Sequence, residues 1–294
     1  LEITTKRLKI IYDKKQFSER GLAIFVLSVP LEYDTYHVQW RYGWKLPNFG
    51  GTTRTLDQIN GACDIEEGIM SPWGAATLDD SKSVIINENG FVFPRKKGIE
   101  DFYFWGYARE FDHCLKDFYY LTGKAPMIPR FALGNWWSRY FKYTEESYME
   151  LIEGFEAEKV PLAVSVIDMD WHEVDIDPKY GSGWTGYTWN KKFFPDPERF
   201  LKWLHDKGMK ITLNLHPADG VRAHEETYEA MAEAMGVDPK TEDPIPFDIT
   251  DEKFVDAYFK VLHHPMEEQG VDFWWIDWQQ GAKCKMEGLD PLWM

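Results

Sequence analysis

Asp277 lies in the segment of this chain that is richest in chemical information, Gly270-Val-Asp-Phe-Trp-Trp-Ile-Asp-Trp-Gln-Gln-Gly281. The β-branched and aromatic residues of Val271–Ile276 predict a buried strand. A carboxylate beside apolar walls costs several kcal/mol unless it is solvated or paired, so packing alone does not explain Asp277. The indole and amide side chains around it suit a sugar, because flat apolar faces match the C–H faces of a sugar ring. We therefore expect Asp277 to be ionised and buried at the floor of a sugar pocket; the alternative is an aspartate that caps a turn.

Polar and aromatic side chains also follow three other predicted strands. Because the carboxyl ends of parallel strands meet on one side of a sheet, we expect these side chains to converge with Asp277. The strand before Asp170 is predicted to end near Met169, so Asp168 is the firmer of the two candidates. The candidate substrate-binding residues are Trp136, Asp168, Asp170, His216, Trp275 and Trp278.

The candidate residues have three alternative roles. His216 could be a buried histidine bonded to backbone, and Arg139 could pair with a carboxylate and hold the shape of the site. Asp168, His216 and Asp277 could in principle hold a metal ion. However, no compact metal-ligand motif supports such a site, so neither a metal nor another cofactor is expected.

The elements that must position these residues alternate between strand and helix after Pro129. This alternation implies parallel pairing through right-handed crossovers, and it predicts that residues 130–294 are the first four βα units of a (β/α)8 barrel. Thr144 and Thr250 are predicted helix N-caps. The inserts Trp171–Lys192 and Pro217–Ile249 both follow strands, so both should shape the pocket. Predicted strands cover Phe131–Trp137, Leu162–Met169, Lys210–His216 and Asp272–Trp278, and predicted helices cover Thr144–Glu158, Asp196–Lys207 and Asp251–His263.

The first 110 residues have a different pattern, with short apolar or alternating runs separated by turn residues. This pattern predicts an N-terminal β-sandwich over residues 1–110. Residues 111–129 are predicted to be a connecting helix, Phe111–Leu121, followed by a hinge that contains Pro126 and Pro129. The predicted fold is therefore a β-sandwich followed by half of a TIM-type barrel.

Several ordered motifs resemble glycoside hydrolase family 31, which includes α-glucosidases and α-xylosidases. The motifs are Gly50-Gly-Thr-Thr-Arg-Thr-Leu56, Leu133-Gly-Asn-Trp-Trp-Ser-Arg139, Ile167-Asp-Met-Asp-Trp171, Gly186-Tyr-Thr-Trp-Asn190 with Phe194-Pro-Asp196, and Trp275-Ile-Asp277. The resemblance covers nearly the whole chain and implies cleavage with retention through a covalent glycosyl-enzyme.

The resemblance also implies roles for particular residues. Asp277 matches the nucleophile, and Asp168 matches the first Asp of the family's D-I-D-Y-M pattern, which binds hydroxyls of the sugar that is cleaved. The family's usual W-I-D-M-N-E is here Trp275-Ile-Asp-Trp-Gln-Gln280, which leaves the identity of the sugar open. The family's acid/base comes from a later strand, beyond Met294. We therefore expect this chain to be a fragment that is inactive alone and that self-associates or pairs with the missing barrel half.

Composition narrows the possible partners. The net charge is −16 and the pI is about 5.0, which argue against nucleic acid or an anionic membrane as the main partner. No run of apolar residues is long enough to span a membrane. The three cysteines form neither a disulfide framework nor a zinc motif, so a reducing, cytoplasmic location is expected.

The favoured function is a retaining α-glycosidase that hydrolyses a terminal α-linked sugar, with an α-glucoside favoured as substrate and an oligosaccharide or α-glycoside as partner. The alternatives are an α-galactosidase or α-xylosidase of the same family, a non-catalytic carbohydrate-binding protein, and a metal-assisted hydrolase.

Overall fold

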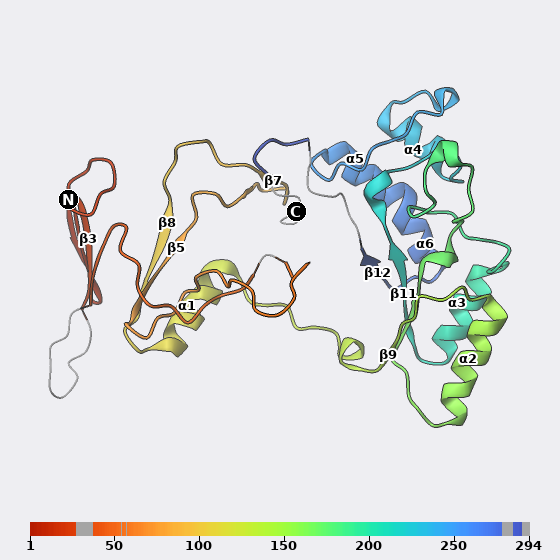
Figure 1. The fold of residues 1–294 in the computed structure, drawn as a ribbon, viewed down its shortest axis with the longest axis horizontal. Coiled ribbons are helices and arrows are strands. Elements are labelled where there is room, and N and C mark those ends of the chain that lie inside the picture. Colours follow the sequence, from red (N-terminus) through yellow and green to blue (C-terminus); the bar gives the residue numbers. More distant parts are fainter. Residues whose placement is uncertain (28–37, 54, 57, 278–284, 290–294) are drawn as a thin grey trace. The chain divides into compact units, whose positions relative to one another are not determined.

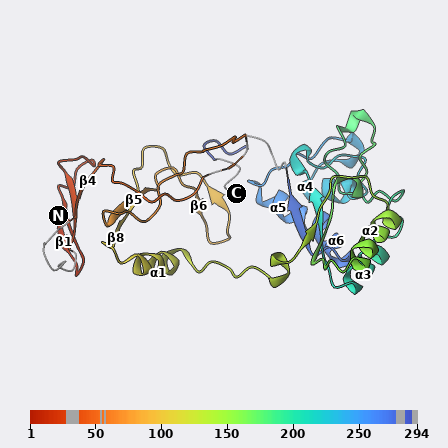
Figure 2. The same ribbon diagram turned by 60° about the horizontal axis from the view of Figure 1, so that its bottom comes forward.

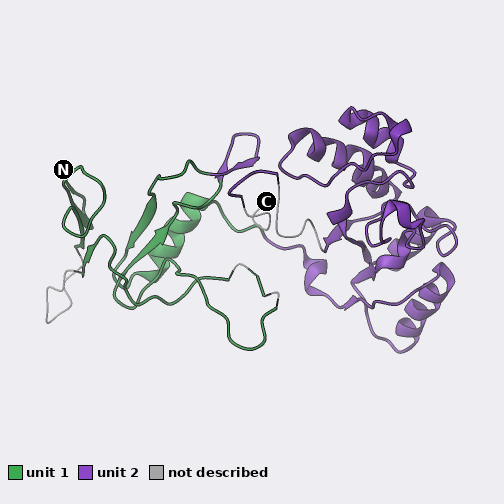
Figure 3. Cartoon of the chain, turned by 45° about the horizontal axis from the view of Figure 1, so that its top comes forward, with its two compact units in different colours: residues 1–84, 95–126 green, residues 85–94, 127–294 purple. Residues whose placement is uncertain are grey.

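The computed structural model describes residues 1–27, 38–53, 55–56, 58–277 and 285–289. The chain forms two compact units, which Figure 3 shows in different colours. Unit 1 comprises Leu1–Val84 with Arg95–Pro126, and unit 2 comprises Ile85–Pro94 with Met127–Met294. All of the predicted site residues belong to unit 2.

Unit 1 is built from antiparallel strands and one helix. Strands β1–β4 form a sheet in chain order, and β5 pairs separately with β8. The ring of Trp40 packs on Phe102 and Phe104 of β8, with centroids 5.4 and 5.6 Å apart. The predicted connecting helix is present as α1 (Phe111–Thr122). These ladders do not by themselves establish the two facing sheets of a sandwich. The strands are β1 (Glu2–Thr4), β2 (Leu8–Tyr12), β3 (Leu22–Val26), β4 (Val38–Arg41), β5 (Ala75–Asp79) and β8 (Phe102–Gly106).

Unit 2 contains a parallel sheet in the order β12-β11-β10-β9 (Figure 1). Each strand therefore pairs with the strand before it in the sequence, as alternating βα units require. The sheet is open, so the described residues form no closed barrel. Its strands are β9 (Trp136–Trp137), β10 (Val164–Ile167), β11 (Lys210–Leu215) and β12 (Phe273–Ile276), and a separate hairpin in this unit pairs β6 (Ile85–Ile86) with β7 (Val92–Phe93).

The prediction of one long strand over Phe131–Trp137 is wrong. Arg130–Leu133 form a turn of 3₁₀ helix, and only two residues remain in β9. The turn closes through the N–H of Gly134, which donates to the carbonyl of Phe131 at 2.9 Å. A Cβ at Gly134 would lie 2.3 Å from that of Ala163, so this close approach requires glycine.

Three helical segments follow the first three strands of the sheet, and Figure 2 labels their helices α2, α3, α5 and α6. Helix α2 (Glu145–Ala157) begins at a capping box in which Thr144 and Ser147 bond reciprocally, as predicted for Thr144. Helix α3 (Pro197–Asp206) is capped by Asp196. The third segment runs through α5 (Glu252–Ala257), a π-helical stretch at Tyr258–His263 and α6 (His264–Gln269).

The prediction that Thr250 caps this third segment is wrong by one residue. The Asp251 carboxylate accepts from the N–H groups of Lys253 and Phe254, so Asp251 is the N-cap. The Thr250 hydroxyl instead donates to Asp248. A further helix, α4 (Tyr228–Met235), lies within the second insert and was not predicted.

The two faces of the sheet differ in character because side chains alternate along each strand. The Tyr148 hydroxyl on α2 lies 2.8 Å from the Ser165 hydroxyl, which identifies the helix-covered face. Ser165 pairs in register with Ile211 of β11, and side chains two residues apart on a strand share a face. Ile211, Leu213 and Leu215 therefore lie on the helix-covered face, where they are fully buried. The other face carries Thr212 and Asn214 of β11 beside Phe273 and Trp275 of β12, and His216 and Asp277 directly follow these two strands.

None of the described helices combines the length and the apolar character that a membrane span requires.

Candidate active site

Asp277 directly follows β12, and its N–H donates to the carbonyl of Leu215 on β11 at 2.8 Å. It therefore lies at the carboxyl end of the sheet, as predicted. The prediction that it is buried is wrong, because 52% of its side chain is exposed. Strand β12 pairs only with β11 in the described sheet, so its outer side is uncovered and Trp275 and Ile276 are also partly exposed. The carboxylate is accessible to a ligand.

His216 is the side chain that lies against Asp277. Its Nε2 is 3.7 Å from Asp277 Oδ2, and only 8% of the imidazole is exposed. Burial lowers the pKa of His216 below its ordinary value, although the carboxylates of Asp277 and Asp168 oppose this shift. The imidazole is therefore neutral at pH 7, with one ring N–H to donate. Its Nδ1 has no hydrogen-bond partner among the described residues, so the expected alternative of a backbone-bonded histidine is not formed here.

The main chain at His216 is fixed by a threonine from the first insert. The Thr185 hydroxyl donates to the carbonyl of His216 and accepts from the N–H of Asp219 at 3.2 Å. Thr185 is itself buried. This hydroxyl therefore binds the first insert to the exit of β11, beside Asp277.

Asp277 and His216 line one side of a pocket of about 450 Å³. The other walls come from the two inserts, as their position after strands predicts. The ring of Trp184 stands edge-on to His216, with centroids 5.1 Å apart and planes at 82°. The remaining lining residues are Ser182, Thr185, Ala218 and Asp219. A pocket of this size, lined by the aspartates Asp277 and Asp219, a neutral imidazole and an indole, offers hydrogen-bonding groups and a flat apolar face to a polar ring.

Further bonds hold the two inserts together. The buried Glu225 carboxylate, from the second insert, accepts from the Tyr187 N–H at 3.0 Å and from the Thr188 hydroxyl at 2.6 Å. Gly186 packs directly on the buried ring of His172, since a Cβ there would lie 2.1 Å from Nδ1. The inserts are thus packed structures rather than loose loops, and they can hold a preformed site.

The two aspartates after β10 have separate surroundings. The Asp168 carboxylate accepts from the N–H of Met169 at 2.7 Å and begins a 3₁₀ turn over Met169–Trp171. Asp170 lies in that turn, 3.5 Å from the ammonium group of Lys142, and lines a neighbouring pocket. The structure therefore brings Asp168 close enough to influence His216 electrostatically but directs Asp170 elsewhere.

Of the predicted aromatic residues, Trp136 and Trp275 lie on the same face of the sheet but do not line the pocket of Asp277. Trp136 is 41% exposed, packs edge-on against Phe273 and donates from its indole N–H to the Ala132 carbonyl. Trp275 lies opposite Asn214, two residues before Asp277. Trp278 lies outside the described residues.

Arg139 lies over the ring of Phe141, with its guanidinium carbon 4.5 Å from the ring centroid. Trp184, which the sequence did not single out, takes the aromatic position beside His216. In the sequence, only the length of the insert that carries Trp184 indicated that this residue could reach the pocket.

Within the described part of the chain, no group of three or more His, Cys, Asp or Glu side chains is arranged to hold a metal ion.

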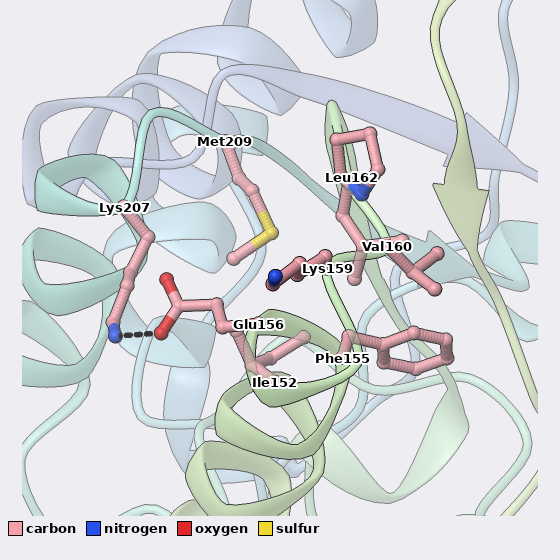
Figure 4. Close-up of a pocket in the computed structure, with 9 residues that line it drawn as sticks. Ile152, Phe155, Glu156, Lys159, Val160, Leu162, Lys207 and Met209 are labelled. Carbon is pink, nitrogen blue, oxygen red and sulfur yellow. Dashed lines mark hydrogen bonds and ion pairs between the residues drawn. The ribbon is translucent and has the colours of Figure 1, made fainter.

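The opposite end of the sheet has different chemistry. A cavity of about 400 Å³ lies where β10 and β11 begin, between Leu162, Met209 and the end of α2 (Figure 4). Its walls combine apolar side chains with Lys159, and Lys207 pairs with Glu156 across its edge. This end resembles the stability face of a βα-barrel rather than its reactive face.

Comparison with known proteins points to one family. A sequence profile of the glycosyl hydrolases family 31 TIM-barrel domain matches residues 125–291, which is more than half of the chain. An α-xylosidase of Saccharolobus solfataricus is 25% identical over 233 residues, which cover 78% of this chain and 30% of that protein. The α-xylosidase XylQ of Lactiplantibacillus pentosus is 34% identical over 99 residues, which cover 33% of this chain and 12% of that protein.

Solved structures share the fold. The GH31 dextranase of Flavobacterium johnsoniae matches with a TM-score of 0.58 and 18% identity over 94% of this chain and 38% of its own. A xylosidase from Aspergillus niger matches with a TM-score of 0.54 and 14% identity over 98% of this chain and 47% of its own. The chain thus spans less than half of each of these relatives. The profile match across the parallel sheet and its helices shows that the chain belongs to glycosyl hydrolase family 31 and carries residues of its TIM-barrel domain.

Proposed function

We propose that this chain supplies the nucleophile of a retaining α-glycosidase. The observation that carries the proposal is an accessible carboxylate, Asp277, at the exit of a parallel strand and on the wall of a preformed pocket. Asp277 attacks the anomeric carbon of a terminal α-linked sugar, the bond to the leaving oxygen breaks, and a glycosyl ester forms. The leaving oxygen takes a proton from a carboxylic acid, and water later hydrolyses the ester.

His216 supports this role. A neutral imidazole can donate one N–H to the Asp277 carboxylate or to a sugar hydroxyl without neutralising the nucleophile. Asp168 is proposed to accept hydroxyls of the same sugar, and Trp136, Trp275 and Trp278 to offer apolar faces. Asp170 is proposed to contact substrate from the neighbouring pocket.

The proposed architecture is an N-terminal β-sandwich over residues 1–110, a connecting segment over 111–129, and the first half of a (β/α)8 barrel over 130–294. The packing of Trp40 on β8 supports the sandwich, and the parallel order of β9–β12 supports the half barrel. In the described sheet β12 pairs only with β11, so pairing of its outer edge with further strands of the barrel or with a second copy is part of this proposal.

An α-glucoside is the proposed substrate, and an α-xyloside is the second candidate. An α-xyloside is kept as the second candidate because both relatives described above that were matched by sequence are α-xylosidases. The rival class is a carbohydrate-binding protein without a reactive nucleophile.

Covalent trapping tests the proposal directly. We expect 5-fluoro-α-glucosyl fluoride or its α-xylosyl counterpart to add one glycosyl mass to the protein, because fluoride leaves with little protonation and the step needs only the nucleophile. Peptide mapping should place the adduct on Asp277. The variant Asp277→Asn should not be labelled, whereas the matched control Asp206→Asn, on the exposed side of α3, should be labelled at the normal rate. Absence of an adduct, or an adduct on another carboxylate, would refute the proposal.

A further inference from the structure

His263 is a buried titratable side chain that the proposed mechanism does not use. Only 1% of the residue is exposed, and neither ring nitrogen has a hydrogen-bond partner among the described residues. The imidazole lies between aromatic rings instead, with its centroid 4.4 Å from that of Tyr258 and 4.4 Å from that of Trp274. An unpartnered N–H group in such a place is costly, so its presence calls for an explanation.

The backbone that carries His263 is also unusual. Tyr258–His263 form a π-helical stretch between α5 and α6, two helices that Figure 1 labels. Pro265 explains the wider turn, because proline has no N–H to donate and, in a regular α-helix, its ring meets the carbonyl four residues earlier. Such turns are rare and occur frequently at functional sites. The stretch is therefore a point at which this helical segment can change its winding.

The surroundings of His263 do not compensate a proton on its ring. Burial, reinforced by the charge of the neighbouring His264, lowers the pKa of His263 to about 4. On α6, the Glu267 carboxylate accepts from the indole N–H of Trp274 at 3.0 Å. Burial raises the pKa of the Tyr258 hydroxyl, so this group carries no charge in acid. Contact of an imidazolium with the two aromatic rings recovers only part of the lost hydration.

The two rings that enclose His263 connect it with the candidate active site. Trp274 belongs to β12 and lies three residues before Asp277. On the other side, the ring of Tyr258 lies edge-on to that of Tyr187 in the first insert, with centroids 6.1 Å apart. Displacement of the His263 ring therefore loosens the packing behind both the strand that leads to Asp277 and the insert that lines its pocket.

We propose that His263 is an acid-operated switch, in which a proton on the imidazole expels the ring from between Tyr258 and Trp274 and opens the π-helical stretch. The opening separates this segment from β12 and from the first insert. The pocket of Asp277 then loses its support in acid and regains it at neutral pH. This inference follows from the packing of His263 and does not rest on the proposed function.

The direction of the pH dependence follows from linkage between protonation and opening. A histidine whose pKa is lowered in the closed state binds a proton more readily in the open state, where the pKa is about 6.5. The closed state is therefore fully favoured above pH 6.5, and it becomes less favoured as the pH falls from 6.5 to about 4. Between pH 7 and pH 5 the ratio of closed to open molecules should fall about 20-fold.

Hydrogen exchange followed by mass spectrometry tests the switch. Exchange is measured at pH 7 and pH 5 in peptides that cover the π-helical stretch and β12, and it is corrected for the intrinsic effect of pH on amide exchange. In the wild type, protection of these peptides should fall about 20-fold at pH 5 and return when the pH is restored. His263→Phe keeps an aromatic ring of similar size but cannot take a proton, so its protection should fall by less than about threefold.

A second variant and a matched control complete the experiment. His263→Gln is polar and also takes no proton, so it should retain protection as His263→Phe does, even if phenylalanine packs poorly. His113→Gln removes an exposed histidine of unit 1 and should lose protection as the wild type does. The peptides also separate His263 from His172 and His216, whose pKa values are lowered by burial but which lie in the first insert and directly after β11.

Two outcomes would overturn the switch. One is full protection of the π-helical stretch in the wild type at pH 5, and the other is a loss of protection there that persists in both His263 variants. Neither outcome affects the labelling of Asp277 by the glycosyl fluoride at pH 7. Failure of the switch and failure of the proposed nucleophile are therefore distinguishable.

Discussion

Asp272 directly precedes β12, the strand that Asp277 follows. Replacement of Asp272 by asparagine should destabilise the sheet. The carboxylate accepts from Lys210 Nζ at 2.6 Å, from His205 Nε2 at 2.7 Å and from the Ile211 N–H at 3.0 Å. Only 16% of the Asp272 side chain is exposed. These bonds join the start of β12 to β11 and to α3.

The size of the effect follows from the exposure of the partners. Breaking a fully buried ion pair costs about 3–5 kcal/mol, and an exposed pair contributes about 0–1 kcal/mol. Lys210 is 45% exposed and His205 is 34% exposed, so the network lies between these limits. We expect Asp272→Asn to lower the free energy of unfolding by about 2 kcal/mol at pH 7. With a urea m-value of about 2 kcal/mol per M, the unfolding midpoint should fall by about 1 M.

The effect should depend on pH in a defined direction. Burial pushes the pKa of Asp272 upward, but the bonds from Lys210, His205 and the Ile211 N–H outweigh burial and hold the pKa below its usual value. A carboxyl group whose pKa is lowered by folding stabilises the protein above its unfolded pKa of about 3.9, and this contribution disappears as the pH falls through the folded pKa. The difference between wild type and Asp272→Asn should therefore be full at pH 7 and pH 5 and shrink below pH 4.

Urea denaturation at these pH values, followed by tryptophan fluorescence, measures the difference. Asp206→Asn is the matched control because its pairing with Lys202, one helical turn away, is exposed on both sides and contributes only about 0.3–0.5 kcal/mol. A midpoint shift for Asp272→Asn as small as that of the control would refute the reasoning. So would a shift of the same size at pH 7 and below pH 4.

Three further substitutions can be measured in the same denaturation assay. Tyr148→Phe removes a buried hydroxyl that lies 2.8 Å from Ser165 Oγ, and it should cost about 1–2 kcal/mol; no loss would show that this bond does not hold α2 on the sheet. Gly186→Ala drives a Cβ into the buried His172 ring and should cost about 1–3 kcal/mol, and an unchanged midpoint would mean that the insert adjusts freely. Gly154→Ala, inside α2 with open space around it, should have the opposite sign and add about 0.5–1 kcal/mol, so a loss there would contradict the helical assignment.

The helices of unit 2 could be predicted from sequence because their boundaries are marked by local chemistry. Thr144 caps α2 as expected, since a side-chain oxygen can satisfy free N–H groups where a helix begins. Asp196, the first residue of the second predicted helix, is the N-cap of α3. The prediction of a strand over Phe131–Trp137 is wrong because aromatic residues favour strands only when the backbone can extend. The tight contact of Gly134 with Ala163 is a tertiary constraint that no local pattern contains.

The candidate site was predictable in its residue types but not in its walls. The carboxyl ends of β11 and β12 bring His216 and Asp277 together, and this follows from parallel pairing alone. The exposure of Asp277 was missed because it depends on which strands cover β12. The place of Trp184 was missed because it depends on how a long insert folds back, which is decided by the bonds of Thr185 across the insert.

The chain-order arrangement of β9 to β12 has a consequence for how the protein is made. A ribosome releases the chain from its amino end, so each new strand finds the strand that it must pair with already synthesised. Unit 2 can therefore assemble progressively, with each βα unit docking on the one before it. Strand β12 is the last of these four to dock, and Asp277 gains its place beside His216 only after β9, β10 and β11 are in position. A nascent chain halted at any earlier step lacks the pairing of Asp277 with His216, so the proposed nucleophile takes its place only after β12 has docked.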